Sequence, residues 1–412
     1  MRLKVRLANT LLAAIITQKP LILFDQFSIR DQFLPMQYGC PVAKIIYPVS
    51  RPTISELEID YVTEAVKSTW IGPTGPFISR MSEYLCEAAN TKYSLPVSNG
   101  TVALHLALLA VGVSPGDEVI VPAFTYIASV NAISYCGAKP VFIDVENDSW
   151  GIDPKELEKA ITPKTKAVIV VHLYGMPASI LEIKAICDKY NLKLVEDCAE
   201  SIFANNNGIT SGEVGDVSTF SFFGNKLLST GEGGAVVTNS EDMAKKLELL
   251  RGQGMDPNRR YWFPIIGYNY RLSNVSAAIF CAQYERREEI LKTRNEIFRE
   301  YSRNLADDPH LKFQPEIEGR IKSPWLYCVL VDPKIRESLM FELAEVGIET
   351  RPFFTPINQM PPYKDEYADI KLLNSEIISS SGINLPTYPD LLPQEIKFIT
   401  TMLKSNLEKL LG

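Results

Sequence analysis

The sequence has 412 residues, of which 46% are hydrophobic and 22% charged, and its formal net charge is −7. This length and composition are typical of a globular chain with one large and one smaller domain. The acidic balance without a Lys/Arg cluster argues against nucleic acid as the main partner, and no apolar run approaches the ~20 residues that span a bilayer.

Residues 1–46 form an N-terminal extension of unknown role. Residues 1–9 are basic and residues 11–16 are a short apolar run, which is weakly similar to a signal peptide, but no small-residue cleavage site follows. We interpret the segment as an additional helix or as the product of a start codon placed too early.

Regular periodicity begins after this extension. Residues 53–68 place their apolar side chains on one helical face. Further along, short Val/Ile-rich runs typical of buried strands alternate with helical segments, which predicts an α/β fold with a mostly parallel sheet covered by helices on both faces. The expected strands are 118–121, 140–143, 167–171, 192–195, 217–222 and 235–238, and the expected helices between them are 101–111, 179–190 and 240–250.

The pattern changes after Arg271. Residues 272–303 predict one long helix, with the charged run 285–289 on a solvated face. We therefore divide the chain into a large α/β domain at 47–271 and a connecting helix with a small C-terminal α+β domain at 272–412. In the small domain we expect a strand near 326–331 and helices near 335–346 and 393–410.

Cysteine and histidine are sparse and scattered. None of the seven cysteines stands in a CxxC pair, and the three histidines lie far apart in the sequence. Metal clusters need closely spaced ligands, so we expect no metal site. An odd number of cysteines without a framework indicates reduced thiols and a cytoplasmic protein.

Ser98, Asn99, Gly100 and Thr101 stand directly before an expected helix. The first turn of a helix leaves backbone N–H groups unpaired and carries partial positive charge. Gly100 lets a ligand approach the backbone closely and Thr101 adds a hydroxyl, so the segment suits a phosphate. A plain helix cap by Ser98 or Asn99 is the commoner use of such residues.

Asp197 follows the expected strand 192–195. Ligands of open α/β sheets bind where the strands end, and a carboxylate at that place can keep a pyridine nitrogen protonated. The alternative is that Asp197 caps a helix.

Lys226 follows the expected strand 217–222 and precedes a glycine-rich turn. A lysine that is partly removed from water loses its proton more readily and can attack an aldehyde. Ser221, five residues earlier, could reach a phosphate. The alternative is an ordinary surface lysine in a hairpin loop.

Asn269 and Arg271 offer polar groups beside two tyrosines, in a segment that could also be an ordinary interface loop. The order of the four motifs along the chain is more specific than any one of them.

With these motifs the chain resembles the DegT/DnrJ/EryC1/StrS family of sugar aminotransferases, which are fold-type I enzymes that use pyridoxal 5'-phosphate (PLP). The resemblance runs from about residue 47 to the C-terminus and rests on SNGTVALHLAL, PAFTYIAS, VEDCAE, SFFGNKLLSTGEGG and GYNYRLSNVSAA. Within the family, the stretches most similar to the GDP-perosamine synthase subgroup are RRYWFPIIGYNYR, IETRPFF, MPPY and GINLPTYPDL.

The resemblance implies roles for the residues around the cofactor ring. Lys226 would hold PLP covalently and shuttle protons, and Asp197 would pair with the pyridine nitrogen. Tyr126 would stack on the ring. Glu200 stands where many members carry Gln beside the ring hydroxyl, so it would have to be protonated or paired.

The resemblance also implies phosphate and substrate contacts. Gly100, Thr101 and Ser221 would bind the cofactor phosphate. Asn269 would reach the phosphate in the neighbouring subunit, which implies a homodimer with a shared active site. For the substrate carboxylate the candidates are Arg271 and Arg351, because arginine offers a two-pronged donor.

The implied reaction moves an amino group from L-glutamate, which becomes 2-oxoglutarate, to C4 of a nucleotide-linked 4-keto-6-deoxyhexose. GDP-4-keto-6-deoxymannose giving GDP-perosamine is the expected pair, with UDP- or dTDP-linked sugars as alternatives. Related dehydratases carry His in place of the lysine, and a regulatory protein on this scaffold needs a DNA-binding module. The sequence has Lys226 and no evident helix-turn-helix pattern. After Glu200 it departs from the family pattern Ala-His-Gly-Ala, reading Ser-Ile-Phe-Ala at 201–204 and continuing Asn-Asn-Asn-Gly.

Overall fold

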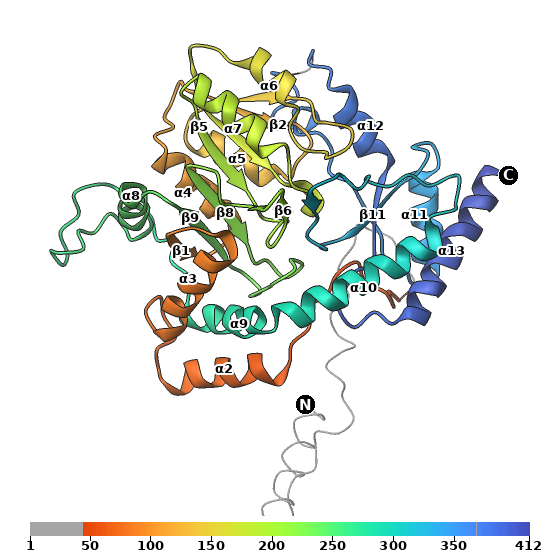
Figure 1. The fold of residues 1–412 in the computed structure, drawn as a ribbon, viewed down its shortest axis with the longest axis horizontal. Coiled ribbons are helices and arrows are strands. Elements are labelled where there is room, and N and C mark those ends of the chain that lie inside the picture. The colour runs from red at the N-terminus through yellow and green to blue at the C-terminus, as the bar shows by residue number, and fades with distance from the viewer. Residues whose placement is uncertain (1–43, 368) are drawn as a thin grey trace, which may run out of the picture. The chain divides into compact units, whose positions relative to one another are not determined.

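The computed structural model describes residues 44–367 and 369–412. Their largest element is a seven-stranded sheet with the strand order β1-β9-β8-β5-β4-β2-β3 (Figure 1). The pairs that join β8, β5, β4, β2 and β3 are parallel, whereas β9 runs antiparallel to both of its neighbours. The predicted mostly parallel sheet is confirmed. Its strands are β1 (Tyr93–Val97), β2 (Glu118–Pro122), β3 (Lys139–Ile143), β4 (Thr165–Val171), β5 (Lys193–Asp197), β8 (Val217–Ser221) and β9 (Gly234–Thr238).

Helices cover both faces of this sheet, as predicted. Alternate residues of a strand point to opposite faces, so Val119 and Val121 of β2 join one core with α4, α5 and α8, while Ile120 joins another with α6 and α7. At the β8-β9 end, α3 and α9 pack on the second face. The helices of these layers are α2 (Glu56–Lys67), α3 (Pro76–Ala89), α4 (Gly100–Ala110), α5 (Ile127–Tyr135), α6 (Pro154–Ala160), α7 (Ile180–Lys189), α8 (Glu241–Arg251) and α9 (Asn274–Glu285), with the short η2 (Leu173–Gly175) after β4.

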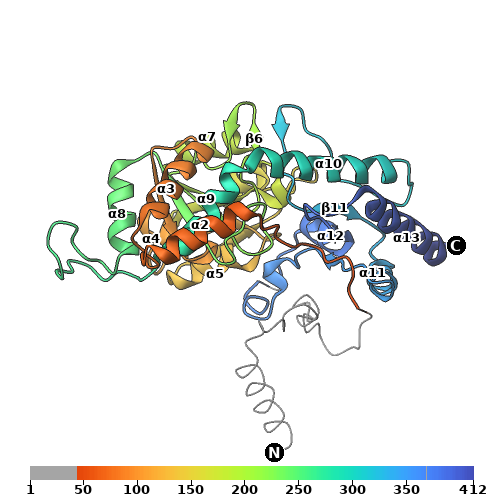
Figure 2. The same cartoon turned by 90° about the horizontal axis from the view of Figure 1, so that it is seen from below.

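The C-terminal part builds a second, smaller layer around an antiparallel sheet of order β11-β13-β12. Its apolar core contains Tyr301 of α10, Leu339 of α11, Ile383 of β13 and Ile399 of α13. These helices lie together at the C-terminal end of the molecule (Figure 2). The elements of this part are α10 (Arg287–Leu305), β11 (Tyr327–Leu330), α11 (Arg336–Glu345), β12 (Arg351–Pro352), η3 (Ile357–Gln359), α12 (Leu373–Ser381), β13 (Gly382–Leu385) and α13 (Pro393–Leu411).

A third, short sheet pairs a strand that follows α10 with two strands from the segment between β5 and β8. It has the order β10-β6-β7 and consists of β6 (Asn205–Asn206), β7 (Ile209–Thr210) and β10 (Arg320–Ile321). The domain boundaries at 47, 271 and 272 stay a prediction, and the N-terminal extension lies outside the described residues except for 44–46. No helix of the described residues has the length and apolar character needed to cross a membrane.

The prediction of one helix over 272–303 is wrong in one respect, because Arg286 separates α9 from α10. The Arg286 guanidinium turns inward to the buried carboxylate of Glu58, with 2.7 Å between Nη1 and Oε1. Its neighbour Glu285 accepts hydrogen bonds from the hydroxyls of Tyr61 and Tyr84. Both residues therefore tie α9 to α2 and α3. Of the charged run, Arg286 turns inward, whereas Glu285, Glu288 and Glu289 are exposed, as predicted.

Helix α9 also supports the end of β8. The Phe280 ring meets the Phe222 ring edge to face, with 4.6 Å between centroids, and both side chains are fully buried. Phe222 directly follows β8, four residues before Lys226. The contact therefore fixes the chain where it leaves the sheet toward Lys226.

We predict that Phe280→Ala lowers the free energy of unfolding by about 3–5 kcal/mol, because it leaves a cavity under the end of β8. Chemical denaturation followed by tryptophan fluorescence measures the loss. Phe341→Ala is the matched control, since the Phe341 side chain is 59% exposed and its removal should cost at most about 0.5 kcal/mol. Equal losses in the two variants would contradict the prediction.

Candidate active site

The carboxyl ends of the parallel strands and the first turn of α4 open on one cavity of about 560 Å³. Parallel topology brings these ends to the same edge of the sheet, where ligands bind in open α/β folds. The predicted site residues that line the cavity are Gly100, Thr101, Tyr126, Asp197, Glu200, Ser221, Lys226 and Arg351.

Lys226 lies in the turn between β8 and β9, and its side chain is 14% exposed. Its Nζ lies 3.7 Å from Oε1 of Glu200 and 4.2 Å from the centre of the Trp325 ring. Burial lowers the pKa of the Lys226 ammonium, although Glu200 and Asp197 act in the opposite direction. The surface-lysine alternative therefore does not describe this side chain.

Two carboxylates are buried beside Lys226. Asp197 ends β5, and its two oxygens accept hydrogen bonds from the Ser129 hydroxyl at 2.7 Å and from the Ala199 amide at 3.1 Å. Burial raises the pKa of Asp197. Glu200 accepts the Tyr174 amide at 2.7 Å, and burial raises the pKa of Glu200 to about 7. Burial therefore disfavours the ionised form of both carboxyls, and the positive charge of Lys226 opposes this effect.

The N-terminus of α4 forms the opposite wall of the cavity. The Asn99 side chain accepts the amide of Val102, and the amides before it have no carbonyl one helical turn earlier to bind. A Cβ placed on Gly100 would lie 2.8 Å from the Ser221 Cβ, so only glycine allows β8 and α4 to approach this closely. The result is a narrow pocket of amide and hydroxyl donors that suits an anion.

Two aromatic side chains complete the cavity and were not singled out in the sequence. Tyr174 is buried, has a positive φ of 50°, and stacks on Phe354 and Trp325. Trp325 donates its indole N–H to the carbonyl of Asn225 at 2.8 Å, next to Lys226. A signal for Tyr174 was present in its position three residues after the end of β4, at the same edge of the sheet as Asp197.

The three remaining polar candidates differ in where they lie. Arg351 enters the cavity from β12, and Glu349 holds its guanidinium at 3.1 Å. Asn269 does not line this cavity but is exposed and pairs with Gly252. Arg271 pairs with Val97 and also lies outside the cavity. The roles of Asn269 and Arg271 stay predictions.

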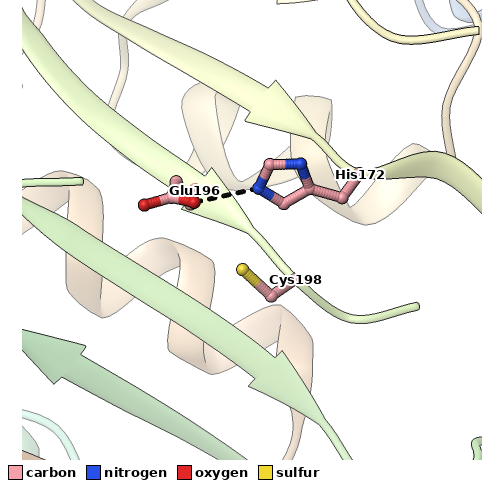
Figure 3. Close-up of side chains that lie close together, drawn as sticks. All are labelled: His172, Glu196 and Cys198. Atoms are coloured by element: carbon pink, nitrogen blue, oxygen red, sulfur yellow. Dashed lines mark hydrogen bonds and ion pairs between the residues drawn. The ribbon is translucent and has the colours of Figure 1, made fainter. Parts of the chain in front are cut away.

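A buried cluster of His172, Glu196 and Cys198 lies behind the edge of the sheet (Figure 3). The His172 Nδ1 accepts the Ala178 amide, so the ring proton is on Nε2, which donates to Glu196 at 2.9 Å. Burial alone would raise the pKa of Glu196, but hydrogen bonds from His172 and from the amides of the loop before β8 hold it below its usual value. Hydrogen bonds within the protein therefore already engage the ring nitrogens of His172 and the carboxylate of Glu196.

Comparison with known proteins gives a consistent result. The sequence profile described as the DegT/DnrJ/EryC1/StrS aminotransferase family matches residues 52–404. The chain is 44% identical over 353 residues to a GDP-perosamine synthase from Caulobacter vibrioides, which covers 84% of this chain and 95% of that protein. It is 42% identical over 353 residues to a GDP-perosamine synthase from Escherichia coli O157:H7, with 85% and 96% covered.

A solved structure supports the same conclusion. The PLP-form of Spr1654 from Streptococcus pneumoniae superimposes with a TM-score of 0.83 at 28% identity, covering 89% of this chain and 99% of that one. The predicted fold class and the resemblance found in the sequence are thereby confirmed. The chain belongs to the DegT/DnrJ/EryC1/StrS family and is a PLP-dependent sugar aminotransferase.

Proposed function

We propose that this aminotransferase moves an amino group from L-glutamate to C4 of a nucleotide-linked 4-keto-6-deoxyhexose, and that its substrate is GDP-4-keto-6-deoxymannose and its product GDP-perosamine. The observation that carries the proposal is the single cavity that joins Lys226, Asp197 and the first turn of α4. The choice of sugar rests on the similarity to two GDP-perosamine synthases.

The residues present fit PLP. The cofactor combines a phosphate, an aldehyde and a pyridine nitrogen, and the cavity offers a partner of suitable chemistry for each. The close packing of Gly100 against Ser221 leaves no room for a side chain at the start of α4, and the free amides of that turn suit the phosphate. Lys226 is the amine for the aldehyde, and Asp197 is the carboxylate for the nitrogen.

When bound, PLP supplies an electron sink for the bonds made and broken at the amino-bearing carbon. Asp197 keeps that sink effective, because a buried carboxylate beside a ring nitrogen favours the protonated ring. The Ser129 hydroxyl and the Ala199 amide hold the Asp197 carboxylate in place. Burial disfavours the ionised form of this carboxylate until a cation pairs with it.

Lys226 is the proposed catalytic residue. Its amine would hold the cofactor covalently and, when free, would carry protons at the substrate carbon. The lowered pKa of its ammonium leaves more of the neutral amine that both tasks need. Tyr126, whose ring is exposed to the cavity, is the proposed partner for the face of the cofactor ring.

Arg351 is the proposed contact for the carboxylate of glutamate, because its guanidinium reaches the cavity and is oriented by Glu349. Arg271 remains a second candidate for this contact. It lies outside the cavity, and its Nε is buried without a hydrogen-bond partner among the described residues.

We further propose a homodimer in which Asn269 serves the second active site. The loop after α8 extends away from the sheet (Figures 1 and 2) and exposes Tyr261, Trp262, Phe263 and Ile266, the last by 89%. An exposed apolar loop of this size is typical of a protein interface. The cytoplasm is the proposed compartment, and the six cysteines of the described residues are all free thiols.

We predict that Lys226→Ala abolishes the absorbance of PLP bound covalently to the protein and lowers turnover by at least ~10²-fold, because both the covalent link and the proton carrier are removed. Absorbance spectra and product formation from glutamate measure the two effects. Lys245→Ala, which changes an exposed lysine of α8, is the control and should behave as the wild type. Unchanged turnover in Lys226→Ala would refute the proposed mechanism.

The same spectra distinguish an enzyme from a regulatory protein on this scaffold. Glutamate alone should convert the bound cofactor to its aminated form in the wild type, with one 2-oxoglutarate released per site. A chain that binds PLP but gives no such conversion would be a scaffold and would contradict the proposed activity.

We predict that Gly100→Ala weakens PLP binding by at least ~10-fold, or about 1.4 kcal/mol, because the added methyl would displace Ser221 and narrow the phosphate pocket. Equilibrium titration of the cofactor-free protein with PLP gives the dissociation constant. Gly72→Ala is the matched control, since a methyl at that position meets no atom within 4 Å. An unchanged dissociation constant in Gly100→Ala would place the phosphate elsewhere.

The substrate proposal has its own test. Purified enzyme is given glutamate with GDP-, UDP- and dTDP-linked 4-keto-6-deoxy sugars, and the products are identified by mass. We expect kcat/KM for the GDP sugar to exceed that of the other two by at least ~10-fold, since a site built for one base leaves polar groups unpaired with another. A preference for UDP or dTDP would overturn the choice of nucleotide and leave the chemistry intact.

A further inference from the structure

Lys226 lies between two groups that both favour its charged form. The Glu200 carboxylate is 3.7 Å from its Nζ on one side, and the face of the Trp325 ring is 4.2 Å away on the other. An amine can attack an aldehyde only in its neutral form. The proton of the Lys226 ammonium therefore needs an acceptor inside the cavity.

We propose that Glu200 is this acceptor and that Lys226 and Glu200 share one proton, which Glu200 takes up whenever Lys226 must act as a neutral amine. The inference rests on the proposed function, because it assumes that Lys226 is the amine that holds PLP. It adds to that function a role that the resemblance does not give, since the family commonly carries Gln at this position.

Geometry selects Glu200 over the other buried carboxylate of the cavity. Both oxygens of Asp197 already accept hydrogen bonds, from Ser129 and Ala199. In Glu200 the Tyr174 amide occupies Oε2, while Oε1 is the oxygen nearest to the Lys226 Nζ. Oε1 is therefore the carboxylate oxygen available to receive the proton.

Burial brings the proton affinities of the two groups together. It raises the pKa of Glu200 to about 7 and lowers the pKa of Lys226. Lys226 opposes the rise at Glu200 by favouring the carboxylate, and Asp197 adds to it by repulsion. The titratable groups that face Glu200 are Lys226, Asp197, Tyr174, Lys322 and Cys328.

The atoms balance in the capture of PLP. The Lys226 nitrogen forms a double bond to the aldehyde carbon, and the aldehyde oxygen leaves as water with two hydrogens of the original ammonium. The third hydrogen leaves as a proton, and Glu200 takes it on Oε1. No oxidant or reductant takes part.

A shared proton would change how the rate of PLP capture depends on pH. Below about pH 7 both groups are protonated, so the reactive pair of neutral Lys226 and protonated Glu200 becomes ~10-fold more abundant per pH unit as the pH rises. Just above pH 7 the pair holds one proton in total. Transfer within the pair then leaves the proton count unchanged, and the reactive fraction becomes independent of pH.

The experiment compares Glu200→Gln with the wild type. Gln keeps an acceptor for the Tyr174 amide but cannot take the lysine proton. The rate at which full-length, cofactor-free protein captures PLP is followed by absorbance from about pH 5 to about pH 9. The ratio of the two rates cancels the titration of PLP itself. We expect this variant-to-wild-type ratio to be constant below pH 7 and to rise by ~10-fold between about pH 7 and about pH 8.

Two controls keep the test decisive. Glu182→Gln removes an exposed carboxylate of α7 that does not line the cavity and should follow the wild-type profile. If Glu200→Gln does not fold, the wild-type profile relative to free Nα-acetyl-lysine, whose side-chain amine is intact, decides alone, because sharing predicts a bend near pH 7. A constant ratio, or a wild-type profile without the bend, overturns the inference. Covalent capture of PLP that persists in Lys226→Ala would instead overturn the proposed function.

Discussion

The burial of opposite charges at the edge of a parallel sheet is the constraint on which the rest of this site depends. Lys226 and Glu200 are 3.7 Å apart and almost removed from water, with Asp197 beside them. A buried charge is costly unless a partner compensates it. The backbone amide of Tyr174, after β4, donates to Glu200, and that of Ala199, after β5, donates to Asp197. Strands β4 and β5 must therefore end where they do. The topology of the sheet is therefore tied directly to the chemistry at its edge.

The C-terminal part contributes to the site through a second buried charge. Arg294 of α10 is 2% exposed and hydrogen-bonds to the carbonyls of Trp325 and Thr387. Trp325 in turn contacts Lys226 and binds the carbonyl of Asn225. The chain of contacts from Arg294 through Trp325 to Lys226 explains why a helix outside the large sheet bears on the reactive amine. The position of Trp325 in the cavity therefore depends on the packing of α10.

Sequence reasoning located most of the sheet because its strands are buried on both faces and carry continuous Val/Ile runs, as in β4. It missed β1, whose Ser94 and Pro96 interrupt the pattern and whose edge position tolerates proline. It also missed the break at Arg286. Helical periodicity continues through that position, and only the distant carboxylate of Glu58 shows why the chain turns there.

The residues of the site likewise fall into those that local sequence patterns predict and those that they do not. Lys226, Asp197 and Gly100 follow or precede regular elements, so their place in the sequence predicted that they would meet at one edge. Arg351 comes from β12 of a different sheet and Trp325 from the segment before β11, and no local pattern says that they reach the same cavity as Lys226. Contacts between parts of the chain that are far apart in sequence are set by packing, which a single sequence does not encode locally.

The departure from the family pattern after Glu200 can now be placed. Residues Asn205–Asn206 form β6, which pairs with β10 and does not line the cavity. Strand β10 leads within a few residues to Trp325, and Arg320 anchors it through the carbonyl of Pro177 and the hydroxyl of Ser179. The divergent segment is therefore linked to the cavity through β10 and does not line it. Differences in sugar specificity should accordingly be sought first among the side chains of the cavity wall.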